Sequence, residues 1–152
     1  MPETVQWPEA RQVFVSYSRG DVAVAGSVMA ELERVGTLVW TDSAVQAGED
    51  WVGAIERGMA GSDVYLLILS PAFLSSEFCL YELGFALRQQ KAGEATIIPI
   101  MVRDIDTDSA PALLRKLQIV DGRGLRADQI VGKVLEVLGQ KRLPRPLEFS
   151  QA

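Results

Sequence analysis

The chain contains no histidine, and this absence removes several kinds of catalytic chemistry. Without an imidazole there can be no Ser-His-Asp triad, no Cys-His pair and no imidazole proton shuttle. A zinc site with the usual cysteine and histidine ligands is excluded in the same way, and we expect no metal site. If the protein is an enzyme, carboxylates, lysines, tyrosines or hydroxyl groups must perform the chemistry.

Other features are scarce as well. The single cysteine, Cys79, makes an intrachain disulfide impossible and favours a cytoplasmic setting. No apolar run approaches the ~20 residues that a membrane span needs, and residues 1–10 lack the basic and apolar segments of a secretory signal. The net charge of −5 argues against general binding to nucleic acid or to an anionic membrane. Neither a Walker-type phosphate loop nor a G-x-G-x-x-G motif occurs, which disfavours kinases, ordinary NTPases and Rossmann dehydrogenases.

What is present is a chain of 152 residues, 48% of them hydrophobic, which is enough for one domain with a sizeable core. Five short runs rich in β-formers alternate with segments of helical period. The expected strands are 12–16, 37–40, 64–69, 96–102 and 118–120, and the expected helices are 22–35, 51–60, 77–90, 111–117 and 125–138. Pro99 lies inside the fourth run, so we expect that strand to be short or near an edge.

The alternation predicts an α/β fold with a doubly wound parallel sheet. For the flavodoxin-like strand order 2-1-3-4-5, ligands bind outside the carboxyl ends of the first and third strands. The segments 17–21 and 70–76 would then open into this crevice, and the loop 41–50 would flank it. We expect residues 1–10 to be a lead-in, 11–140 to form the domain, and 141–152 to be a tail or linker.

One acidic residue does not fit the expected core. The unbroken apolar run 64–69 predicts a central strand, and Ser75 or Ser76 can cap the helix that begins near Glu77. Glu82 lies on that helix, and its neighbours three and four residues away are all apolar: Phe78, Cys79, Phe85 and Ala86. No Lys or Arg at helical spacing neutralises Glu82, so its carboxylate costs free energy unless something pairs with it or uses it. An ion pair with a Lys or Arg from elsewhere in the chain stays open as the structural alternative.

Taken together, these residues resemble a TIR domain. The resemblance rests on VFVSYSRGD, VWTD, the glycine-containing loop, Trp51, LLILSPAFLSSEFCLYEL and IIPIMV, and covers roughly 11–140. It implies the five-stranded flavodoxin-like sheet. It also implies either a scaffold of immune signalling or an enzyme that cleaves NAD⁺ between nicotinamide and ribose, with NAD⁺ as substrate and no further cofactor.

The resemblance also implies roles for particular residues. The catalytic acid of enzymatic TIR domains is the Glu of C-x-x-E-L, here Glu82. Phe78 stands where the family usually has a Trp that stacks on substrate, and this departure makes cyclisation chemistry less expected than cleavage. Ser18 and Arg19 follow the first strand, where a basic residue suits a diphosphate.

The remaining expected substrate-binding positions are Asp42 and Gln46 of the loop and Trp51 after it. Each has a simpler reading: Arg19 as a solvated turn residue, Trp51 as a core anchor, and Asp42 and Gln46 as loop structure.

The first hypothesis is therefore an NAD⁺ nucleosidase that yields nicotinamide and ADP-ribose, with a cyclised product as a variant. The resemblance implies activation by self-association through the loop Thr41–Asp50, a trigger in a fused or separate sensor domain, and a role in bacterial immune defence. The alternative is a non-enzymatic TIR interaction module that nucleates signalling assemblies.

Overall fold

A computed structural model describes residues 12–41, 51–106, 108 and 110–140, and the side chains of these residues except at positions 51, 52, 113 and 140. Five parallel strands form one sheet in the order β2-β1-β3-β4-β5. The strands are β1 (Gln12–Ser16), β2 (Leu38–Trp40), β3 (Val64–Leu69), β4 (Thr96–Met101) and β5 (Val120–Asp121). This order confirms the predicted flavodoxin-like α/β fold.

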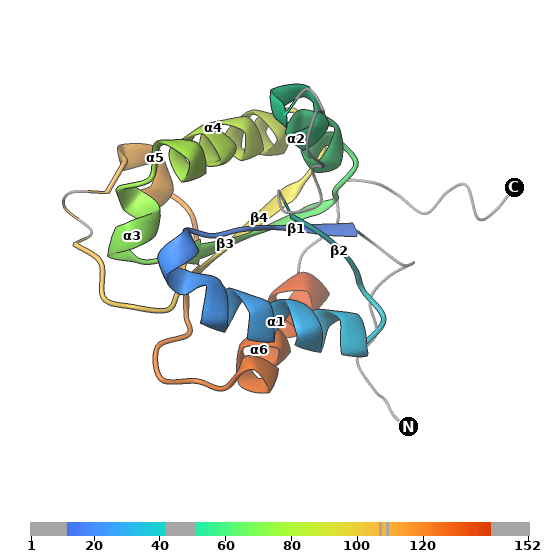
Figure 1. The fold of residues 1–152 in the computed structure, drawn as a ribbon, viewed down its shortest axis with the longest axis vertical. Coiled ribbons are helices and arrows are strands. Elements are labelled where there is room, and N and C mark those ends of the chain that lie inside the picture. The colour runs from blue at the N-terminus through green and yellow to red at the C-terminus, as the bar shows by residue number, and fades with distance from the viewer. Residues whose placement is uncertain (1–11, 42–50, 107, 109, 141–152) are drawn as a thin grey trace, which may run out of the picture.

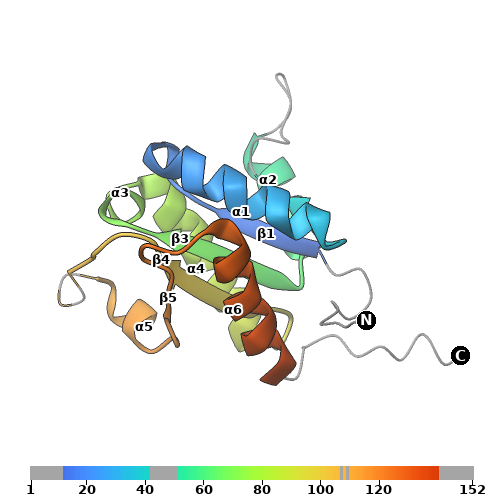
Figure 2. The ribbon, with the colours of Figure 1, turned by 90° about the horizontal axis from the view of Figure 1, so that it is seen from below.

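Helices cover both faces of the sheet (Figure 1). On one face lie α1 (Val22–Arg34) and α6 (Ala127–Gln140), which Figure 2 shows in front of the strands. Against the other face pack α2 (Trp51–Ala60), α3 (Pro71–Leu74), α4 (Glu77–Lys91) and α5 (Ala112–Arg115). The predicted helices all occur, with ends that differ by a few residues.

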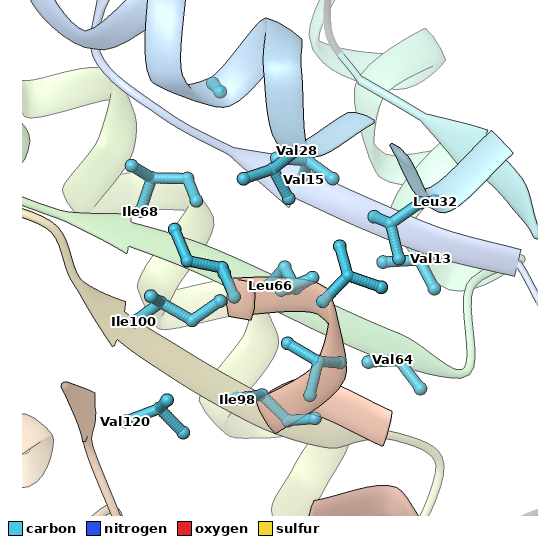
Figure 3. Packing of buried hydrophobic residues seen from close by; sticks show 14 of the residues in the cluster. Val13, Val15, Val28, Leu32, Val64, Leu66, Ile68, Ile98, Ile100 and Val120 are labelled. Atoms are coloured by element: carbon cyan, nitrogen blue, oxygen red, sulfur yellow. The ribbon is translucent and has the colours of Figure 1, made fainter. Parts of the chain in front are cut away.

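The central strand is β3, whose six residues are all buried. It pairs with β1 on one side and with β4 on the other, so both of its faces are covered by helices. Its alternate residues Val64, Leu66 and Ile68 point toward α1 and α6 into an aliphatic core (Figure 3). Tyr65, Leu67 and Leu69 belong to the core beneath α2 and α4.

Two short helical turns were not predicted. The 3-10 turn η2 (Arg19–Asp21) follows β1, and α3 follows β3. The α3 turn begins because Ser70 Oγ accepts a hydrogen bond from Phe73 N and Pro71 occupies the first turn. Of the two serines proposed as the cap of α4, Ser76 is the one, with its Oγ accepting from Cys79 N at 3.1 Å.

Pro99 lies in β4, the second strand from the sheet edge, as predicted. It is opposite Leu67 of β3, whereas β5 pairs only with Ile100 and Met101. At Pro99 the strand therefore has a neighbouring strand only on the β3 side. A missing N–H on the open side costs no ladder hydrogen bond. Among the described residues, none of the helices has the length and apolar character needed to cross a membrane.

Candidate functional site

The strand order reverses at β1 and β3, so the edge formed by their carboxyl ends is the place where this fold type binds ligands. Ser16 ends β1 and lies opposite Leu67 of β3. Residues alternate along β1, so Val13 and Val15 enter the core beneath α1, and Phe14 and Ser16 point toward α4. A hydroxyl group therefore ends the row on the α4 side.

Glu82 reaches this hydroxyl from α4. Only 1% of Glu82 is exposed, and its Oε1 accepts a hydrogen bond of 2.5 Å from Ser16 Oγ. The Ser76 cap fixes where α4 starts, and the buried neighbours Cys79, Leu83 and Ala86 seat the helix on the sheet. The structure thus places the out-of-pattern carboxylate at the carboxyl end of β1, held by a neutral donor.

Phe78 lies one helical turn before Glu82, is partly buried, and packs against the core beneath α4. On the outer side of the same helix, Tyr81 donates a hydrogen bond to Glu56 of α2. This bond to a carboxylate raises the pKa of Tyr81 and links α2 to α4 at the surface.

The two residues predicted after the first strand behave differently from each other. Ser18 caps η2, because its Oγ accepts a hydrogen bond from Gly20 N at 3.4 Å. Arg19 is exposed on the same turn. Asp21, the residue at the N-cap position of α1, makes no side-chain cap bond. Asp42 and Gln46 lie outside the described residues, as does the side chain of Trp51, whose backbone begins α2.

Sequence reasoning missed a second buried acid at this edge. Asp21 is 1% exposed, and its two oxygens accept hydrogen bonds from Ser70 Oγ and from Arg103 Nε, the latter at 3.0 Å. Its partners Ser70 and Arg103 come from distant parts of the chain, so no local pattern marks it as buried. Ser16 was also missed, although a serine in alternation with Phe14 at the end of a buried strand was a usable signal.

Two hollows lined only by described residues lie elsewhere. One of about 550 Å³ lies between the outer face of α4 and the residues that follow α5, and one of about 290 Å³ lies near the start of β4. Neither is lined by Glu82 or Ser16. The loop that was predicted to flank the crevice is outside the described residues beyond Thr41, so its contribution stays a prediction.

Comparison with known proteins agrees with the fold. Three curated relatives match: the uncharacterized protein y4lF of Sinorhizobium fredii is 35% identical over 65% of this chain and 32% of its own length. The NAD(+) hydrolase TcpA of a Theionarchaea archaeon is 26% identical over 85% of this chain and 40% of its own. The human Toll/interleukin-1 receptor domain-containing adapter protein is 26% identical over 78% and 55%. The chain thus spans about a third to a little over half of these proteins.

Among solved structures, the TIR domain of the Toll-related receptor TRR-2 from Hydra magnipapillata superposes with a TM-score of 0.65 at 22% identity, covering 83% of this chain and 92% of that one. At this identity the likeness concerns the fold. A family model described as TIR domain matches residues 13–135, which is most of the chain and includes β1 from Val13 onward, the other four strands and α4. The chain therefore belongs to the TIR domain family.

Proposed function

We propose that this domain cleaves NAD⁺ between nicotinamide and ribose, with Glu82 acting on the ribose. The observation that carries the proposal is the position of the Glu82 carboxylate: buried, at the carboxyl end of β1, and held by Ser16 Oγ at 2.5 Å. Family membership and the relative named NAD(+) hydrolase TcpA support the same reaction.

The reaction suits a single carboxylate. Nicotinamide leaves as a neutral molecule, because the electron pair of the breaking C–N bond returns to its cationic ring, so no acid has to protonate it. The ribose becomes oxocarbenium-like, and a carboxylate that accepts hydrogen bonds from its hydroxyl groups stabilises the positive charge as it develops. Water then forms the new bond to the same carbon and gives up a proton, yielding ADP-ribose. Preorganised groups of this kind contribute about 3–4 kcal/mol to transition-state stabilisation.

Ser16 has a positioning role in this proposal. Its hydroxyl orients Oε1 of Glu82 and adds a hydrogen bond that the buried carboxylate needs. Phe78, one turn earlier on α4, and Trp51, at the start of α2, are proposed to wall the pocket. Ser18 and Arg19 are proposed to meet the diphosphate, and Asp42 and Gln46 to contact the substrate from the loop.

We infer that activity depends on self-association through the loop Thr41–Asp50, triggered by a fused or separate sensor domain. Family membership supports this assembly, and bacterial immune defence is the proposed setting. Hydrolysis to linear ADP-ribose is favoured over cyclisation, because Phe78 lacks the indole N–H of the tryptophan usual in the family.

The test is release of nicotinamide from NAD⁺ by concentrated or crowded protein, followed for the wild type and for Glu82→Gln. The variant keeps the size of the side chain, so we expect an unchanged fold by circular dichroism and a rate at least about 10²–10³-fold lower. Glu33→Gln, an exposed acid of α1, is the matched control and keeps the wild-type rate. Equal rates for Glu82→Gln and the wild type would refute the role of Glu82.

The second candidate is a non-enzymatic interaction module. The observation that favours it is the match to the human adapter protein over 78% of the chain. Under this alternative, assembled wild-type protein releases no nicotinamide, while Glu82→Gln assembles as the wild type does.

A further inference from the structure

The carboxylate of Asp21 connects segments that follow three different strands. Asp21 lies five residues past the end of β1, Ser70 directly follows β3, and Arg103 lies two residues past β4. Ser70 Oγ donates to Asp21 Oδ2, and Arg103 Nε donates to Asp21 Oδ1 at 3.0 Å. Both oxygens of this buried carboxylate are thus engaged by protein donors, so Asp21 is built to hold other groups in place.

Arg103 is held in a different way from the other paired arginines of the described residues. Arg34 and Arg126 each bind a carboxylate through Nε and Nη2. Arg123 uses Nε and both Nη groups on Asp121 and Asp104. Arg103 uses Nε alone. Its two Nη groups have no protein partner in the described part of the chain, and its side chain is 62% exposed, so they can be reached by a ligand.

A guanidinium fixed at Nε presents its two Nη groups as a preoriented fork, the geometry that matches two oxygens of a phosphate. Because the hydrogen bond to Asp21 already restricts the Arg103 side chain, the side chain loses less conformational entropy when an anion binds. Arg103 lies at the same edge of the sheet as Ser16 and Glu82, where Arg19 is also exposed. In a chain of net charge −5, these two arginines supply positive charge where a dinucleotide would lie.

We propose that Arg103 binds the diphosphate of the dinucleotide substrate, and that Asp21 is a positioning residue for its guanidinium. This inference rests on the proposed cleavage of NAD⁺ and adds a residue from the far side of β3 to the site. Arg19, without a carboxylate partner among the described residues, supplies charge at the same edge but no fixed fork.

The experiment compares the wild type with Arg103→Gln, Arg103→Lys and the control Arg34→Gln, whose side chain is similarly exposed at 69% but lies at the far end of α1. Calorimetric titration with ADP-ribose measures binding without turnover. Arg103→Gln is expected to weaken binding about tenfold, or ~1.4 kcal/mol, and Arg34→Gln to leave it unchanged. Arg103→Lys keeps the ion pair with Asp21 and hence the melting temperature, yet loses the fork and stays at least about threefold weaker than the wild type.

Kinetics provide the second measurement. For Arg103→Gln we expect the KM for NAD⁺ to rise about tenfold with little change in kcat, and the KM for nicotinamide riboside, which has no phosphate, to stay as in the wild type.

Wild-type ADP-ribose affinity in Arg103→Gln, or equal losses with both substrates, would overturn the inference while nicotinamide release still upholds the proposed function. Arg103-dependent binding of ADP-ribose by a wild type that releases no nicotinamide would uphold the binding site and refute the reaction. If the wild type neither binds ADP-ribose nor releases nicotinamide, both proposals fall.

Discussion

The two faces of the sheet bury side chains of different kinds. Toward α1 and α6, every member of the buried cluster is aliphatic, from Val13 and Val15 of β1 to Leu138 of α6. Toward α2 and α4, the cluster includes aromatic and sulfur-containing side chains, among them Phe14, Tyr65 and Met59. Only this second face also buries, within the described residues, an acid of a helix against a strand, namely Glu82 against Ser16.

The difference arises within single strands. In β1, two residues that face α1 are valines, and the two that face the other way are Phe14 and Ser16. Aliphatic packing on one face stabilises the fold without polar groups that need partners. The other face accepts the cost of a buried carboxylate, and a cost retained in this way is typical of functional sites.

The largest expected effect comes from truncating the central strand on each face. Leu66→Ala, in the aliphatic core, is expected to lower the free energy of unfolding by about 2–5 kcal/mol, because it leaves a cavity in a close-packed region. Leu67→Ala, on the other face and opposite Ser16, should cost a similar amount. Urea unfolding measures both.

The two truncations should differ in activity. Below its unfolding transition, Leu66→Ala is expected to keep the rate of nicotinamide release, whereas Leu67→Ala loosens the packing beside Ser16 and lowers it. Equal loss of activity in both variants would contradict the idea that only the α4 side of the sheet supports the candidate site.

The second effect tests the buried polar pair itself. Ser16→Ala removes a donor from a carboxylate that stays buried, and we expect a cost of about 1–3 kcal/mol. The double variant Ser16→Ala/Glu82→Leu replaces the pair by apolar groups and should recover part of the stability lost in Ser16→Ala. A double variant that is less stable than Ser16→Ala alone would show that the pair stabilises this face.

How far the sequence predicts this face depends on the range of the interactions. The position of Glu82 followed from its own helix, because apolar neighbours three and four residues away define the buried stripe. Its donor did not, since Ser16 lies 66 residues away and meets Glu82 only through the register of β1 and the packing of α4. The central strand and the Ser76 cap were likewise local signals and were predicted.

The contact between Asp21 and Arg103 spans 82 residues and depends on the strand order. Asp21 follows a polar turn, which is typical of exposed loops, and nothing near it in the chain shows that three strand ends converge there. The short turns η2 and α3 escaped prediction because a single turn has too few residues to show a period.

The third effect uses two helical glycines as probes of packing. In α2, a Cβ at Gly58 would lie 2.5 Å from the ring of Trp40, which stacks on Phe14 with centroids 5.4 Å apart. Gly58→Ala must displace this ring, and the net cost should be about 1–2 kcal/mol after the gain in helix propensity. In α1, a Cβ at Gly26 meets nothing within 4 Å, so Gly26→Ala is expected to stabilise by about 0.5–1 kcal/mol.

Thermal unfolding of the two alanine variants measures this contrast directly. Stability changes of opposite sign would show that Trp40 packs directly on the backbone of α2 at Gly58, whereas α1 has room for a methyl group at Gly26. Stabilisation by both substitutions would mean that Trp40 can move at little cost.

The smallest expected effect comes from an acid that water reaches. Asp121, at the end of β5, binds Arg123 through both carboxylate oxygens, and these hydrogen bonds hold the pKa of Asp121 far below its usual value of 3.8. A lowered pKa means that Asp121 stabilises the folded state above pH 3.8 and loses that contribution as the pH falls below it.

Because both side chains are largely exposed, Asp121→Asn should lower the melting temperature at pH 7 by no more than about 2 °C. The difference should shrink as the pH falls from 4 toward 2, because Asp121 of the unfolded wild type then binds a proton that the folded state does not bind. A difference in melting temperature that grows on acidification would contradict the predicted sign of this linkage. A loss of stability at pH 7 as large as that of Ser16→Ala would contradict the contrast between an exposed acid and the buried acid on α4.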